Sequence, residues 1–117
     1  RGNMIEGFRF GEIVIRGATY REDVKIRADG GVTHPWWRGS GHRVEPEDVR
    51  DLLGDGPQLV ILGMGQPGRM RASASLLREL EEKGIRLVER PTQEAAEELN
   101  AAVERGERVC AGFHLTC

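Results

Sequence analysis

The amino-acid sequence predicts an α/β fold, a single-domain three-layer sandwich built around a mixed β-sheet. Three observations support this prediction. The chain has 117 residues, enough for one domain with an ordinary core and too few for two. Residues 8–37 are strand-like and interrupted by glycines, which predicts an antiparallel hairpin region. Residues 59–115 alternate apolar runs with helical periodicity, which predicts a β-α-β-α-β half with parallel strands.

The N-terminal half is predicted to form strands separated by tight turns. In the segment DVKIR, at 23–27, apolar and charged residues alternate, so this strand has one buried and one solvated face. Residues 1–7 are expected to be an extension that precedes a single domain at 8–117. The predicted strands are 12–15, 23–27 and 31–38.

The C-terminal half carries clearer helix and strand signals. The run LVIL at 59–62 is apolar throughout, which predicts a strand covered on both faces. Pro46 suits the first turn of a helix, and Gly84 and Gly106 suit the ends of two more. The predicted elements are a helix at 46–53, a strand at 59–62, a helix at 73–83, a strand at 85–89, a helix between Pro91 and Gly106, and a strand at 108–115.

Composition narrows the classes of function. Charged residues make up 31% of the chain, and no apolar segment approaches the roughly 20 residues that span a bilayer. No signal-type apolar run follows the first residues, so we expect no membrane association and a cytoplasmic location. The 19 acidic residues outnumber the 17 Lys and Arg, giving a net charge of -2. We therefore expect no nucleic-acid partner.

The cysteines and histidines predict neither a disulfide nor a metal site. In an extended segment Cys110 and Cys117 lie on the order of 20 Å apart, beyond the roughly 4.4 to 6.8 Å that a disulfide bridges. His34, His42 and His114 have no metal-ligand spacing, so no metal or cofactor is expected. On a strand, His114 and Cys117 would face opposite sides, which argues against a catalytic pair. We expect His114 to form hydrogen bonds within the fold and Cys110 to be a small buried residue.

Residues 59–68 read LVILGMGQPG, in which Gly63, Gly65 and Gly68 match the dinucleotide-binding pattern G-x-G-x-x-G. In that fingerprint the following helix begins among the glycines, so that its N-terminus meets the pyrophosphate. Here the helix is predicted to begin only near Ser73, and the chain has room for half of a dinucleotide domain. Both facts argue against dinucleotide binding.

Two other interpretations of the glycine-rich loop stay open. In the first, the glycines only permit a sharp turn, and Arg69 and Arg71 are solvated. In the second, backbone N–H groups, the polar side chains and the next helix N-terminus form a small anion site for a phosphate, a carboxylate or an acidic side chain. The candidate loop residues are Gly63, Gly65, Gln66, Gly68, Arg69 and Arg71.

The adjacent tryptophans Trp36 and Trp37 would face opposite ways on a strand. One would then serve the core while the other lines a pocket or a partner surface; alternatively, both cover edges of the core. The candidate pocket or interface residues are Trp37, Arg38, His42 and His114.

Four segments resemble the small Mth domain family, which includes the adipogenesis-associated Mth domain-containing protein and a mitochondrial assembly factor of NADH:ubiquinone oxidoreductase. They are FGEIVIRGATYREDVKIRADGGV at 10–32, WWRGSGHRVEPEDV at 36–49, LVILGMGQPGRMR at 59–71 and RVCAGFHLTC at 108–117. The resemblance implies one α/β domain with a β-hairpin packed on a mixed sheet. It implies no catalytic residues, because the best-described relatives act by binding proteins.

The leading functional hypothesis is a non-enzymatic cytoplasmic domain of assembly-factor or adaptor type, which binds an unidentified protein partner. The alternative is a nucleotide-binding or small-molecule-binding protein, or an enzyme of unknown reaction, that uses the loop at 63–71. Exposed edge strands in the first half also allow a homodimer.

Overall fold

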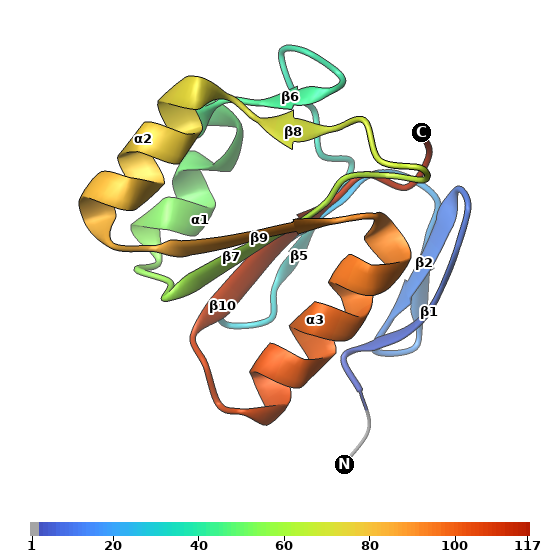
Figure 1. Ribbon diagram of the computed structural model, residues 1–117. Helices are drawn as coiled ribbons and strands as arrows, with labels where there is room; N and C mark the ends of the chain where they lie inside the picture. The colour runs from blue at the N-terminus through green and yellow to red at the C-terminus, as the bar shows by residue number, and fades with distance from the viewer. Residues whose placement is uncertain (1–2) are drawn as a thin grey trace.

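Five strands form the central sheet of the computed structural model, which describes residues 3–117 (Figure 1). Their order is β5-β4-β10-β7-β9, with β10, β7 and β9 parallel and with β4 and β5 antiparallel to their neighbours. The predicted mixed sheet is thus confirmed. The strands are β4 (Val24–Ile26), β5 (Val32–Thr33), β7 (Leu59–Gly63), β9 (Arg86–Arg90) and β10 (Val109–Phe113).

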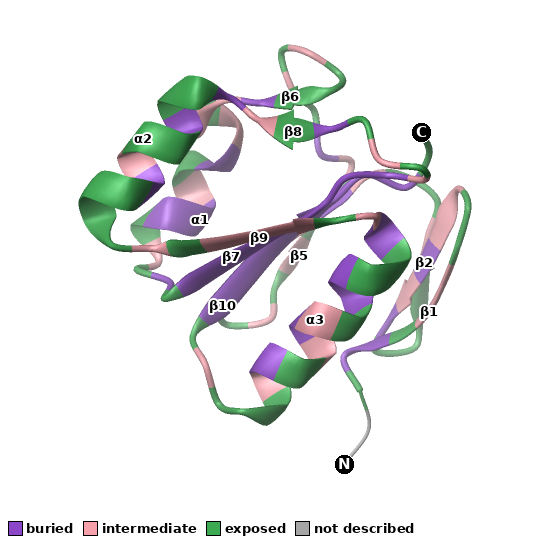
Figure 2. Cartoon of the chain, viewed as in Figure 1, coloured by how far each residue is buried: buried purple, intermediate pink, exposed green. Residues whose placement is uncertain are grey.

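Helices cover both faces of this sheet and make it the middle layer of a sandwich (Figure 1). On one face lies α3 (Thr92–Glu104), and on the other lie α1 (Arg50–Gly54) and α2 (Ala74–Lys83). Strands β7 and β10 are buried at every position, as Figure 2 shows, because both of their faces are covered. Along β7, Leu59 and Ile61 join the core beneath α3, whereas Val60 and Leu62 join the core beneath α1 and α2.

An antiparallel sheet of β1 (Ile5–Arg9), β2 (Glu12–Ile15) and β3 (Ala18–Tyr20) packs against the α3 side. The Asn100 side chain of α3 holds β1 in place. The Asn100 Oδ1 accepts from the Ile5 N–H at 2.9 Å, and the Asn100 Nδ2 donates to the Ile5 carbonyl at 2.9 Å. Strand β1 therefore begins inside the segment 1–7, for which the sequence predicted an extension.

The helix boundaries follow the sequence signals closely. Helix α2 begins after Ser73, whose Oγ accepts from the Leu76 N–H at 3.1 Å, and ends at Gly84, which has a φ of 69°. The helix predicted at 46–53 has a 3-10 first part, η1 (Pro46–Val49), that leads into α1. The Asp48 side chain accepts from the Glu45 N–H at 2.8 Å and so closes a capping box there.

The strands predicted at 31–38 and 108–115 were too long, and four strands were not among those predicted: β1, β3 and two short ones. The strand predicted at 31–38 stops at Thr33, because Pro35 has no N–H to continue a ladder. The last strand stops at Phe113 rather than at residue 115. The His114 N–H still donates to the Gly63 carbonyl of β7, but the Leu115 N–H leaves the sheet and donates to the Asp23 side chain. The missed strands β6 (Arg43–Val44) and β8 (Arg71–Ala72) pair in parallel; two residues each are too few to show a period.

Within residues 3–117, none of the helices combines the length and the apolar character that crossing a membrane requires.

Candidate functional site

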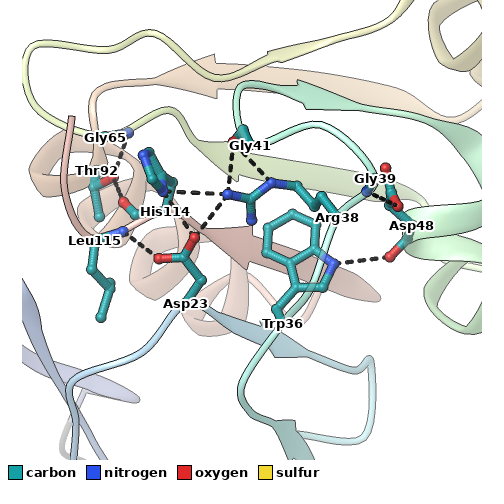
Figure 3. Close-up of polar contacts among 10 residues, drawn as sticks. All are labelled: Asp23, Trp36, Arg38, Gly39, Gly41, Asp48, Gly65, Thr92, His114 and Leu115. Carbon is teal, nitrogen blue, oxygen red and sulfur yellow. Dashed lines mark hydrogen bonds and ion pairs between the residues drawn. The ribbon is translucent and has the colours of Figure 1, made fainter.

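Asp23, Arg38 and His114 form a polar cluster at the edge of the sheet where β7 and β10 end (Figure 3). The Asp23 Oδ2 lies 2.8 Å from His114 Nδ1 and accepts from Arg38 Nη2 at 2.8 Å. The Asp23 Oδ1 accepts from the Leu115 N–H at 2.9 Å. Because Asp23 lies directly before β4, which pairs with β10, the topology itself brings these side chains together.

The Arg38 guanidinium is buried, with only 5% of its side chain exposed. It lies over the Trp36 ring, with the guanidinium carbon 4.5 Å from the ring centroid. Its Nε and Nη2 also donate to the Gly41 carbonyl at 3.2 and 2.8 Å. Because Asp23 balances its charge, this cation is tolerated in the interior.

The pKa of the Asp23 carboxyl is held below its ordinary value. Burial opposes ionisation, but the hydrogen bonds from His114, from the Leu115 N–H and from Arg38 outweigh it. An ionised Asp23 can only accept, so the His114 Nδ1 carries the proton that points at it. As predicted, His114 thus forms hydrogen bonds within the fold.

Two nitrogen atoms of the cluster have no hydrogen-bond partner among residues 3–117: Nη1 of Arg38 and Nε2 of His114. The first belongs to the guanidinium over the Trp36 ring, where an aromatic face can partly substitute for an acceptor. The second belongs to a ring that meets His42 edge to face, with the centroids 5.5 Å apart. His114 therefore presents an unused nitrogen beside the exposed His42.

Trp36 and Trp37 have opposite environments, which matches the first of the two alternatives, although neither residue lies on a strand. Trp36 is 3% exposed, and its Nε1 donates to the Asp48 carbonyl at 2.9 Å. Its ring packs against Gly112 of β10, where an added Cβ would lie 2.6 Å from a ring atom. Trp37 is 79% exposed. One tryptophan therefore anchors the segment 34–42 to the core, and the other projects from it.

A pocket of about 430 Å³ opens beside Trp37. It is of the size that usually accommodates a small molecule or one long side chain. Two acidic residues and one basic residue line it, together with both tryptophans. Its lining residues are Glu22, Asp23, Pro35, Trp36, Trp37, Arg38 and Gly41.

The glycine-rich loop between β7 and β8 packs against the chain itself. The Gly65 N–H donates to Thr92 Oγ1 at 2.8 Å, and the Gln66 N–H donates to the Thr116 carbonyl at 2.9 Å. The N–H groups of Met64, Arg69, Met70 and Arg71 also donate to carbonyls of the protein. These six N–H groups are therefore engaged within the protein, and the interpretation of the loop as an anion site stays a prediction.

The sequence-predicted residues fall into two neighbouring sets joined by His114. Gly65 faces the His114 ring, since a Cβ added to Gly65 would lie 2.7 Å from His114 Cδ2. Arg38 and His42 contact the same ring, whereas Trp37 lines the pocket. Gly63 packs against Phe113, Gly68 lies near Met64, and Arg69 and Arg71 are exposed.

The sequence did not single out Asp23, Glu22 or Thr92. Thr92 Oγ1 donates to the His114 carbonyl at 2.6 Å while it accepts from Gly65. A threonine in the first turn of a helix is too common to signal such a role. The pairing of β4 with β10, not visible in the sequence, gives Asp23 its importance.

The cysteines are free and the described residues hold no metal cluster. Cys110 is buried, and burial raises the pKa of its thiol to about 12, whereas Cys117 is exposed. Among residues 3–117, no three His, Cys, Asp or Glu side chains lie close enough together to hold a metal ion.

Fold and site define a single-domain α/β protein of three layers with a buried Asp-His-Arg cluster at one edge of its sheet. The chain belongs to the family described as "Protein of unknown function (DUF498/DUF598)", whose model matches residues 5–114.

Solved structures of the same fold support this assignment. The structure named MT938 is 29% identical, with a TM-score of 0.83, over 99% of this chain and 100% of that one. The conserved hypothetical protein PH1505 from Pyrococcus horikoshii OT3 is 25% identical, with a TM-score of 0.78, over 97% and 98%. A Mth938-like domain from Bordetella pertussis is 17% identical, with a TM-score of 0.68, over 97% and 85%, and shows the fold alone. The resemblance to the Mth domain family is thus confirmed.

Proposed function

We propose that this protein is a non-enzymatic interaction domain of adaptor or assembly-factor type, which docks a partner protein on the surface around Trp37. The observation that carries the proposal is the 79% exposure of Trp37 at the rim of a pocket of about 430 Å³. Exposed tryptophans beside pockets are frequent energetic centres of protein interfaces. We propose a cytoplasmic location, which suits the free thiols of Cys110 and Cys117.

The two residues on either side of Trp37 support this role because both are held in place. Trp36 is fixed by its hydrogen bond to Asp48, and Arg38 by its ion pair with Asp23. Anchored neighbours hold the backbone at Trp37, so little backbone freedom is lost on binding and more of the contact energy becomes affinity.

The test is capture of the partner by the purified protein and its variants from a lysate of the organism that encodes it. Bound proteins are crosslinked and quantified by mass spectrometry, and their affinities are then measured with purified partner. We expect Trp37→Ala to weaken binding by about tenfold or more, as hot-spot substitutions do. Leu77→Ala, which removes another exposed apolar side chain on α2, serves as the control and should leave binding unchanged.

The proposal fails if Trp37→Ala retains the same partners with the same affinity as the unsubstituted protein. It also fails if nothing is enriched by the protein over the affinity tag alone. Thermal unfolding of both variants checks that each is folded; both positions are exposed, so stability should change by less than about 0.5 kcal/mol.

A further inference from the structure

We infer that the pocket beside Trp37 receives a cationic side chain, an arginine or a lysine, of the partner protein. This inference rests on the proposed function, because it names the chemistry of the partner at the same surface. It follows from the charges of the pocket wall, from the exposed indole and from the pocket's size.

The charge that the lining of the pocket leaves available to a ligand is negative. The lining includes two acidic residues, Glu22 and Asp23, and one basic residue, Arg38. Asp23 and Arg38 neutralise each other at 2.8 Å, and both oxygens of Asp23 already accept hydrogen bonds. Glu22 has no such buried partner: its side chain is 56% exposed, and its ion-pair contact is His34 Nδ1 at 3.4 Å. Among the charged residues that line the pocket, Glu22 is therefore the one whose charge is available to a ligand.

The apolar part of the wall suits the rest of a basic side chain. The indole of Trp37 is exposed and so offers its negative π face to a cation. Pro35, which is half-buried, supplies apolar surface for the methylene stem. A volume of about 430 Å³ is sufficient for one long side chain.

An anionic occupant fits this pocket poorly. The Nε and Nη2 atoms of Arg38 are engaged by Gly41 and Asp23, and its Nη1 is buried. An incoming carboxylate would find no exposed cation there and would be repelled by Glu22. The inference thus distinguishes basic from acidic partner segments.

The test is an NMR titration of the full chain, which has two tryptophans and hence two indole N–H signals. The spectrum of Trp37→Ala assigns the two signals. The probes are N-acetyl-L-arginine methylamide and its lysine counterpart, with the neutral isostere N-acetyl-L-citrulline methylamide as control, at constant ionic strength. We expect a saturable shift of the Trp37 indole signal with both basic probes, and binding of the citrulline derivative at least about threefold weaker.

The variants locate the interaction. We expect Glu22→Gln to weaken binding of the arginine probe by about two- to fivefold, the range for an exposed charge pair. Glu82→Gln, which removes an exposed carboxylate on α2, should leave it unchanged. The inference is overturned if citrulline binds as well as arginine, if Glu22→Gln has no effect, if N-acetyl-L-glutamate methylamide binds better, or if neither basic probe shifts the signal at tens of millimolar.

These outcomes are separable from the proposed function. If partner capture depends on Trp37 but no basic probe binds, the docking surface stands and its cationic occupant does not. If the basic probes bind but no partner depends on Trp37, the pocket is a cation site and the interaction role fails.

Discussion

Asp23 holds three separate parts of the chain together through a single carboxylate. One oxygen accepts from the Leu115 N–H, and the other contacts both Arg38 and His114. The burial of Arg38 depends on this negative charge, because an unpaired guanidinium in the interior is strongly destabilising. At the scale of single residues, the candidate site therefore also stabilises the fold.

Replacing Asp23 with asparagine tests whether its carboxylate stabilises the fold. The Asn amide nitrogen would face donors, and the buried Arg38 charge would lose its counter-ion. We expect Asp23→Asn to lower the free energy of unfolding by about 3 kcal/mol, measured by urea denaturation. Glu82→Gln is the surface control and should change it by less than about 0.5 kcal/mol. A loss for Asp23→Asn as small as that of the control would contradict the assignment.

The depressed pKa of Asp23 predicts that the stability difference between the native protein and Asp23→Asn depends on pH. The folded-state pKa of Asp23 is depressed, so its contribution is fully present above the unfolded pKa of about 3.9 and is lost as the pH falls through the folded value. The stability difference between the native protein and Asp23→Asn should therefore be constant above about pH 5 and shrink below about pH 4. A difference that stays constant into the acid range would show that Asp23 is not ionised in the fold.

At the scale of elements, the loop after β7 is shaped by the C-terminal segment that lies against it. Gly65 has a φ of +93°, and a Cβ there would lie 2.3 Å from the Thr116 carbonyl oxygen. Its N–H donates to Thr92 of α3. Gly65 thus marks a crossing point of two chain segments, which gives the glycine at this position a structural reason that involves no nucleotide.

Substituting Gly65 with alanine should therefore be costly. We expect Gly65→Ala to destabilise the fold by about 3 kcal/mol in chemical denaturation, since it combines a positive φ with a backbone clash. Gly39→Ala is the matched control, because an added Cβ at Gly39 meets nothing within 4 Å and its φ is not positive. Similar losses for the two variants would refute the close approach.

At the scale of the whole molecule, β7 and β10 belong to both cores. Their side chains alternate between the α3 side and the side of α1 and α2. Neither core can lose its packing without disturbing the strands that support the other. The domain is therefore expected to unfold as one cooperative unit.

Truncating one leucine in each core tests this coupling. Leu99→Ala on α3 and Leu80→Ala on α2 should each lower the free energy of unfolding by about 2–5 kcal/mol. In a Trp37→Ala background the remaining tryptophan, Trp36, lies in the core beneath α2, so the fluorescence reports on that side. In Leu99→Ala, the fluorescence and far-ultraviolet circular dichroism transitions should still coincide. Separate transitions would show that the two cores unfold independently.

The sequence predicted the elements with strong local signals and missed the contacts made by topology. Ser73 and Gly84 fixed α2 because caps act locally, and the apolar run at 59–62 indicated a strand covered on both faces. Trp37, Arg38 and His114 were named as site residues, whereas Asp23 was not. Its importance comes from the antiparallel pairing of β4 with β10, between segments far apart in the sequence. No local pattern encodes such a pairing.

The position of β10 in the sheet has a consequence for how the chain reaches its fold. Of the five strands this one comes last in sequence, yet it lies between β4 and β7. Until it docks, both neighbours present bare backbone edges of the kind that recruit other chains. The five-stranded sheet cannot form before β10 has been synthesised, and the long-range pairings of β10 favour slow folding. Until β10 is made, the chain is therefore expected to expose the edges of β4 and β7 and to be at greater risk of aggregation.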